Sequence, residues 1–245
     1  MTELLVVAGI GVVVFLLAAL AQAVSGFGSA LVAVPLLALA VGPSTAVVAA
    51  TVISMVISAR AWRREPSEVD LPLARTLTVA GVLGMPCGLL VLTRADDRTL
   101  TLVVAVALLV AVALMWSRVV LPTGRRSVWA SGVTSGLLLT ATGMNGPPLV
   151  LSLQAAGLPP RRFRATLQAV FCGQGAVAVT AFALTGQLHA TTLAAIAGGV
   201  VGLPAGWAVG NRIFQRLSPE QFRSIVLSGL VVTAVVALGN VFVGA

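Results

Sequence analysis

The sequence predicts an all-α integral membrane protein with about eight to ten membrane segments, since a membrane-spanning helix takes about 20 apolar residues. Three observations support this fold class: the composition, a series of apolar runs, and a pattern of glycines and prolines that occurs twice. Of the 245 residues, 58% are hydrophobic and 9% are charged, against about 25% charged in soluble domains. The mean hydropathy is +1.07. This composition excludes a soluble enzyme, a disordered chain and a secreted disulfide scaffold.

Charged residues and Gly/Pro turns divide the chain into apolar runs. In order they cover residues 3–24, 26–41, 44–63, 71–93, 97–119, 128–142, 146–157, 163–186, 190–211 and 218–243. Three runs, 26–41, 128–142 and 146–157, are short, because as helices they measure about 18–24 Å against about 30 Å of hydrocarbon. Backbone that ends inside a bilayer must be covered by protein or line a wet cavity. We therefore expect the functional site at these short segments.

One sequence pattern occurs twice. Residues 80–88 read AGVLGMPCG and residues 198–206 read GGVVGLPAG, and upstream of them the broken segment 26–29 (GFGS) matches 143–146 (GMNG). The pattern predicts two internal repeats of five segments each. Small residues four apart favour close helix packing, which is the role we assign to the repeated glycines of 80–88 and 198–206. The prolines there are expected to kink their helices.

The repeats define the domain organisation. We expect a single transmembrane domain over 1–245, made of repeat 1 (1–119) and repeat 2 (128–245) and joined by a cytoplasmic linker (120–127). In each repeat the first two segments form a hairpin that is broken at a Gly- or Pro-containing tip.

The distribution of arginine predicts that the two repeats have opposite orientations in the membrane. All 15 basic residues are Arg, and cytoplasmic loops of membrane proteins carry an excess of such residues. Arginines follow the third segment in repeat 1 but precede the third segment in repeat 2. With this inverted topology, only Arg94 and Arg98 lie on the outer side, and both termini are outside.

The hairpin tips, 26–29 (GFGS) and 143–148 (GMNGPP), are the expected site. Inverted repeats with broken helices hold transporter substrates near the membrane midplane, and the second helix of each hairpin begins at its tip. Helix N-termini bind anions, while glycines allow close approach of the backbone. The candidate binding residues are Ser25, Gly26, Gly28, Ser29, Thr51, Thr142, Gly143, Asn145, Gly146, Pro147, Thr166 and Gln168. For each one alone, a packing role or a bond to its own backbone is an equally good interpretation; Gln174 is ambiguous.

The sequence lacks the residue patterns typical of proton-coupled transport, catalysis and metal binding. All seven acidic residues lie at or beyond the ends of the runs, so no carrier for proton coupling is visible. We find no nucleophile–base pair and no metal-ligand spacing, and the arginines are explained by membrane orientation rather than by nucleic acid. We therefore expect no enzyme activity, no metal, no cofactor and no nucleic-acid partner.

Several motifs resemble those of a known family. They are GFGS followed by PL, then TGMNGPPLVL, GLPPRRFRAT and the repeated G-x-x-G-x-P-x-G. In this order they resemble the TauE/SafE family, the sulfite exporter and sulfonate permease group of bacterial inner-membrane proteins. The resemblance implies a secondary transporter, usually an exporter, of sulfite, sulfoacetate or a related organosulfonate. It also implies that Arg164, in the FRAT motif, lies at the cytoplasmic end of its helix, where it could collect anions.

The expected function is therefore export of a small sulfur-containing anion from a site between the two broken hairpins. Two alternatives stay open: a passive anion channel with the same hairpins, and a non-transporting membrane scaffold. The expected partners are the anionic substrate and the lipid bilayer, and a homodimer is possible. The expected location is the bacterial inner membrane.

Overall fold

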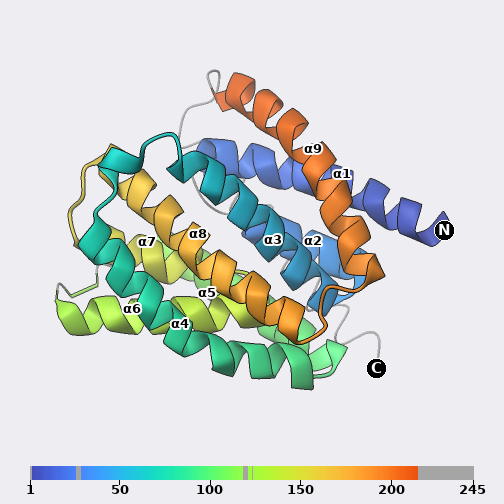
Figure 1. The fold of residues 1–245 in the computed structure, drawn as a ribbon, viewed down its shortest axis with the longest axis horizontal. Helices are drawn as coiled ribbons and strands as arrows, with labels where there is room; N and C mark the ends of the chain where they lie inside the picture. Colours follow the sequence, from blue (N-terminus) through green and yellow to red (C-terminus); the bar gives the residue numbers. More distant parts are fainter. Residues whose placement is uncertain (1, 26–28, 118–120, 123, 215–245) are drawn as a thin grey trace.

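The protein is a bundle of helices (Figure 1). The computed structural model describes residues 2–25, 29–117, 121–122 and 124–214. The helices are α1 (Thr2–Ser25), α2 (Ser29–Val41), α3 (Pro43–Trp62), α4 (Leu71–Arg94), α5 (Asp97–Ser117), α6 (Arg125–Thr142), α7 (Gly146–Ala155), α8 (Pro160–Leu184) and α9 (Ala190–Phe214), with a short 3₁₀ helix, η1 (Pro66–Glu68), before α4.

The helices correspond to the apolar runs of the sequence. Every run up to 190–211 is a helix, while the run 218–243 lies outside the described residues. Within the described part of the chain, α1, α3, α4, α5 and α8 are long and apolar enough to cross a membrane. The all-helical membrane fold is thereby confirmed. The inverted relation of the two repeats stays a prediction.

The second helix of each predicted hairpin is short, as expected. Helix α2 has 13 residues and α7 has 10, which correspond to about 20 Å and 15 Å of helix. Helix α6 is longer than predicted and begins at Arg125, within the predicted linker. Its first turn is formed by charged residues, which a helix accepts wherever its end lies outside the apolar layer.

Acidic residues cap helices at the ends of the bundle. Asp70 caps α4, since the Leu73 amide donates to Asp70 Oδ1 (3.1 Å). Asp96 has the same position before α5, where the Thr99 amide donates to Asp96 Oδ2 (3.4 Å). The Thr99 hydroxyl also donates to Asp96 Oδ1 (2.6 Å), and this bond holds the pKa of the Asp96 carboxyl below its ordinary value. These acids thus have local structural roles outside the apolar segments.

The repeated glycines bring two pairs of helices into backbone contact. Helix α4 packs on α6 and α9 packs on α1, and Figure 1 shows the pairs on opposite sides of α3 and α8. A Cβ at Gly84 or Gly88 would overlap a carbonyl oxygen of α6, and one at Gly202 or Gly206 would overlap a carbonyl oxygen of α1. The packing role predicted for these glycines is confirmed. The prolines in the same motifs lie inside helices that continue past them.

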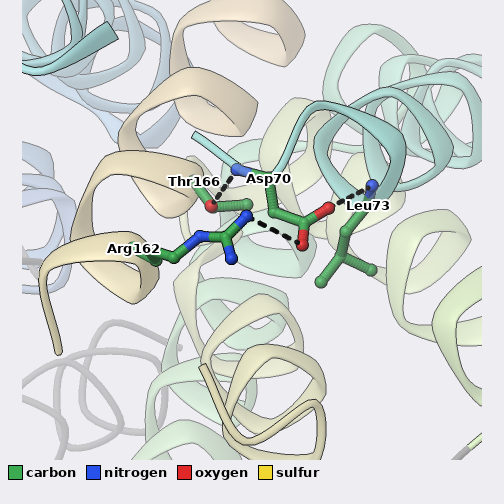
Figure 2. A network of polar contacts seen from close by, with 4 residues as sticks. All are labelled: Asp70, Leu73, Arg162 and Thr166. Carbon is green, nitrogen blue, oxygen red and sulfur yellow. Dashed lines mark hydrogen bonds and ion pairs between the residues drawn. The ribbon is translucent and has the colours of Figure 1, made fainter. Parts of the chain in front are cut away.

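The two halves of the chain meet at two places where the start of a helix contacts a loop. In one, Ser44 Oγ donates to Gln187 Oε1 (3.0 Å). In the other, Arg162 Nη2 lies 3.7 Å from Asp70 Oδ2, and the Asp70 amide donates to Thr166 Oγ1 (2.9 Å), as Figure 2 shows. Each contact joins the start of the third helix of one half, α3 or α8, to the loop that follows the third helix of the other half. They tie α3 and α8 into the centre of the bundle.

The glycine contacts yield a stability prediction. Gly84→Ala is expected to lower the stability by about 1–3 kcal/mol, because a methyl group there is forced against the backbone of α6. The matched control is Gly9→Ala on α1, where no atom lies within 4 Å of an added Cβ. This control is expected to be neutral, or to stabilise by up to about 1 kcal/mol through helix propensity. Thermal unfolding in detergent, followed by size-exclusion chromatography, measures both; equal shifts would contradict the assigned packing role.

Candidate functional site

A cavity lies against the first turns of the two short helices. Its volume, counted as space open to the centre of a water molecule, is about 30 Å³, which is room for roughly two waters. The lining residues come from α1, α2, α3, the end of α6, the start of α7, and α8. They are Gln22, Ser29, Ala30, Leu31, Thr51, Ser54, Met55, Ser58, Leu139, Gly143, Met144, Asn145, Gly146, Phe171 and Gly175.

Residues at the start of α2 line this cavity. They are Ser29, Ala30 and Leu31. Amide groups in the first turn of a helix generally lack a partner within that helix, and a helix start carries a partial positive charge. Ser29 Oγ lies 3.0 Å from Ser54 Oγ of α3, a hydrogen bond that joins the hairpin tip to the hydroxyl groups of α3.

The turn between α6 and α7 forms the opposite wall. Gly143 ends α6 in the left-handed conformation (φ 71°), which glycine adopts without strain. Gly146 then begins α7, and both glycines line the cavity. Pro147 and Pro148 follow in the first turn, where the missing proline N–H removes donors that would otherwise be free. Gly146 is therefore the only backbone donor among the first three residues of α7.

Asn145 is held at this turn by a buried glutamine. It precedes the first residue of α7, but its side chain makes no capping hydrogen bond. Its Nδ2 donates instead to Gln174 Oε1 on α8 (3.0 Å). Ser135 Oγ donates to the same oxygen (2.8 Å), while Gln174 Nε2 donates to the carbonyl of Leu77 (3.1 Å). Gln174 is fully buried and thus fixes Asn145 against α4 and α6.

Hydroxyl groups along one face of α3 form a third wall. Thr51, Ser54 and Ser58 all line the cavity, and residues spaced by three and four share one face of a helix. Thr51 donates its hydroxyl to the carbonyl of Val47 in its own helix (2.8 Å). None of the lining residues has an ionisable side chain. The described lining is therefore uncharged and carries hydroxyl and amide groups among apolar side chains.

The cavity brings together five of the residues proposed from the sequence: Ser29, Thr51, Gly143, Asn145 and Gly146. Five others lie outside its lining: Thr142, Pro147, Arg164, Thr166 and Gln168. Gly26 and Gly28, and the side chain of Ser25 at the end of α1, are outside the described part of the structure.

The residues away from the cavity have other surroundings. The Thr142 hydroxyl donates to the carbonyl of Leu138 (2.8 Å), and the hydroxyl of Thr166 accepts from Asp70, as in Figure 2. Arg164 is exposed in the early part of α8, whereas Gln168 is buried in the same helix. These placements give Thr142 and Thr166 structural hydrogen bonds.

Sequence reasoning missed three polar residues of the lining: Gln22, Ser54 and Ser58. The sequence could have indicated the two serines, because their spacing from Thr51 places all three residues on one face of a helix. Gln22 had no such indication, since a single amide in an apolar helix does not indicate which neighbour it faces. Among the described residues, no cluster of His, Cys, Asp and Glu could hold a metal ion.

The fold and the cavity define a multi-pass membrane protein with a small uncharged cavity between its helices, lined by apolar side chains and by hydroxyl and amide groups. A family profile described as "Sulfite exporter TauE/SafE" matches residues 11–237, which is nearly the whole chain. The protein therefore belongs to the TauE/SafE family, a family of membrane transporters. Comparison with curated proteins and with solved structures gave no significant match.

The site geometry yields a prediction for Asn145. If the cavity holds the transported substrate, Asn145→Leu is expected to reduce flux in proteoliposomes by at least about tenfold, through loss of a polar contact to that substrate. Folding is expected to persist, because Gln174 Oε1 keeps its bond from Ser135. The control is Gln154→Leu, which replaces an exposed amide on the same helix and leaves flux unchanged. Normal flux in Asn145→Leu would remove this residue from the site.

Proposed function

We propose that the protein is a secondary transporter that exports a small sulfur-containing anion, such as sulfite, sulfoacetate or a related organosulfonate. The substrate site is the cavity between the starts of α2 and α7. The observation that carries this proposal is the convergence of two helix starts and a row of hydroxyl groups on one uncharged cavity. Membership of a family described as sulfite exporters supports the substrate class.

The chemistry of the cavity suits a carrier of anions. Helix N-termini stabilise negative charge without a fixed cation, and serine and threonine hydroxyls add donors that can rotate toward a ligand. An anion held by neutral dipoles is bound less tightly than one paired with a buried arginine. Such a site favours binding and release in the same cycle, as transport requires.

Arginines on the predicted cytoplasmic side complete the proposal. Arg164 is exposed near the start of α8, and Arg60, Arg63 and Arg64 are exposed around the end of α3. A positive surface at the entrance raises the local concentration of anions. In this arrangement the protein lies in the bacterial inner membrane with both termini outside, and Arg164 collects substrate from the cytoplasm.

The membrane potential supplies a driving force for export. Moving one negative charge out of a negative-inside cell is favourable by about 2.3 kcal/mol per 100 mV. That free energy supports a concentration ratio of roughly 50, since about 1.4 kcal/mol corresponds to a factor of ten. Uniport of a monoanion therefore needs no coupled proton, consistent with acids confined to the ends of the apolar runs.

The orientation predicts the accessibility of two loops. In a Cys87→Ala, Cys172→Ala background, Ser67→Cys is expected to react with a membrane-impermeant maleimide only from the cytoplasm. Thr185→Cys is expected to react only from the outside, because the loop after α8 has no arginine. Both positions are exposed in the protein. Labelling of intact cells and of inverted vesicles measures this; reaction of both positions from one side would contradict the inverted topology.

The transport proposal predicts electrogenic flux in proteoliposomes. A panel of sulfite, sulfoacetate, isethionate, taurine, sulfate and lactate should give saturable current and counterflow for a sulfur-containing monoanion. Current that does not saturate, without counterflow, would indicate the channel alternative. Flux of isethionate, whose charge does not change with pH, that follows a pH gradient at clamped voltage would contradict uniport. Silence across the panel in correctly inserted protein that copurifies with a partner would favour the scaffold alternative.

A further inference from the structure

Two buried polar atoms in the cavity have no hydrogen-bond partner. They are Gln22 Oε1 on α1 and Ser58 Oγ on α3, whose residues are 2% and 0% exposed. Both residues line the cavity together with Ser29 and Asn145. Buried polar side-chain atoms in native proteins are almost always paired with protein or water. A molecule in the cavity can therefore supply the hydrogen bonds that these two atoms lack.

The two atoms need different hydrogen-bond partners. A serine hydroxyl both donates and accepts, whereas an amide oxygen only accepts. Rotating the Gln22 amide exchanges its oxygen and nitrogen but leaves an oxygen that still needs a donor. The sulfite dianion, sulfate and simple alkanesulfonates offer acceptors alone. An occupant that satisfies Gln22 must itself carry a hydrogen on oxygen or nitrogen.

The uncharged lining of the cavity also favours a monoanion over a dianion. The described lining has no ionisable side chain. The ionisable groups of the elements packed around it lie beyond the lining: Arg60 and Arg63 follow Ser58 toward and past the end of α3, and Cys172 follows Phe171 on α8. The penalty for removing an ion from water rises with the square of its charge in the Born description. Neutral hydroxyls and helix ends offset this penalty for a monoanion far better than for a dianion.

We infer that the cavity selects a monoanion that keeps a hydrogen-bond donor: hydrogensulfite in preference to the sulfite dianion. Gln22 Oε1 accepts a hydrogen bond from the anion, and Ser58 Oγ donates a hydrogen bond to one of the anion's oxygens. The starts of α2 and α7 face the negative charge. This inference rests on the proposed function and adds to it the protonation state of the transported species and the residues that recognise it.

Sulfite flux at several pH values gives the first test. Proteoliposomes are held at clamped voltage with equal pH on both sides, on the acid and on the alkaline side of the pKa that separates hydrogensulfite from sulfite. The KM for total sulfite is expected to rise with pH, while the KM expressed as hydrogensulfite stays constant. A KM for total sulfite that is unchanged or falls at alkaline pH would overturn the inference.

Two monoanions whose charge does not change with pH separate the effect of a hydrogen-bond donor from the effect of charge. Isethionate and propanesulfonate have similar size and equal charge, but only isethionate carries a hydroxyl group. Isethionate is expected to compete with sulfite about tenfold better than propanesulfonate, because it pairs with the Gln22 oxygen. Equal competition would overturn the inference while leaving sulfite transport intact. Absence of flux for every sulfur anion at every pH would instead reject the proposed function.

Variants link this selectivity to the named residues. Gln22→Leu is expected to abolish the roughly tenfold preference for isethionate, and Ser58→Ala to raise the KM for sulfite by about tenfold. Both should fold, since replacing an unpartnered buried polar group by an apolar one does not break a bond, and thermal unfolding checks this. Gln154→Leu, on the exposed side of α7, is the control and keeps the preference. A preference that persists in a folded Gln22→Leu variant would overturn the assignment.

Discussion

Helix backbone that ends inside the protein is the constraint on which the rest of this structure depends. In a membrane, unpaired amide groups have no water to bond, so a helix that starts within the apolar layer needs a polar space beside it. Helices α2 and α7 start at buried residues, Ser29 and Gly146, and the cavity lies against their first turns. The close glycine contacts of α4 with α6 and of α9 with α1 build the flanks of the bundle on either side of α3 and α8. The architecture and the polar site are thus two results of one requirement.

The sequence predicted the helices well because membrane spans depend on local composition. The run 71–93 became α4 (Leu71–Arg94) almost unchanged, since charges bound it at both ends. Helix α6 began earlier than expected, because arginines at a helix end face water and do not terminate the helix. The packing of Gly84 and Gly202 was also predictable, as their spacing to Gly88 and Gly206 produces a flat helix face wherever the partner helix comes from.

The site was only half predictable, because it depends on tertiary neighbours. The glycines and Asn145 at the tip near 143–146 stood out through their turn chemistry, and they line the cavity. Gln22 and Ser58 lie within ordinary apolar helices, and their importance follows only from which helices surround them. Thr166 illustrates the converse: its sequence context resembled that of Thr51, yet its hydroxyl accepts from the backbone of Asp70. Side-chain direction around a helix axis is decided by packing, which one sequence does not contain.

The consecutive prolines at the start of α7 have a consequence for how a ligand lies in the cavity. Three residues at the start of α2 line the cavity and each has a backbone N–H, whereas Pro147 and Pro148 leave Gly146 as the one backbone donor among the first three residues of α7, beside the side-chain amide of Asn145. The two tips, which match each other in sequence, have therefore become chemically unequal. A ligand between them does not have two equivalent poses related by symmetry. For the substrate proposed above, this asymmetry would give a preferred polarity, with the most negative end toward α2, so that each transport cycle would begin from the same orientation.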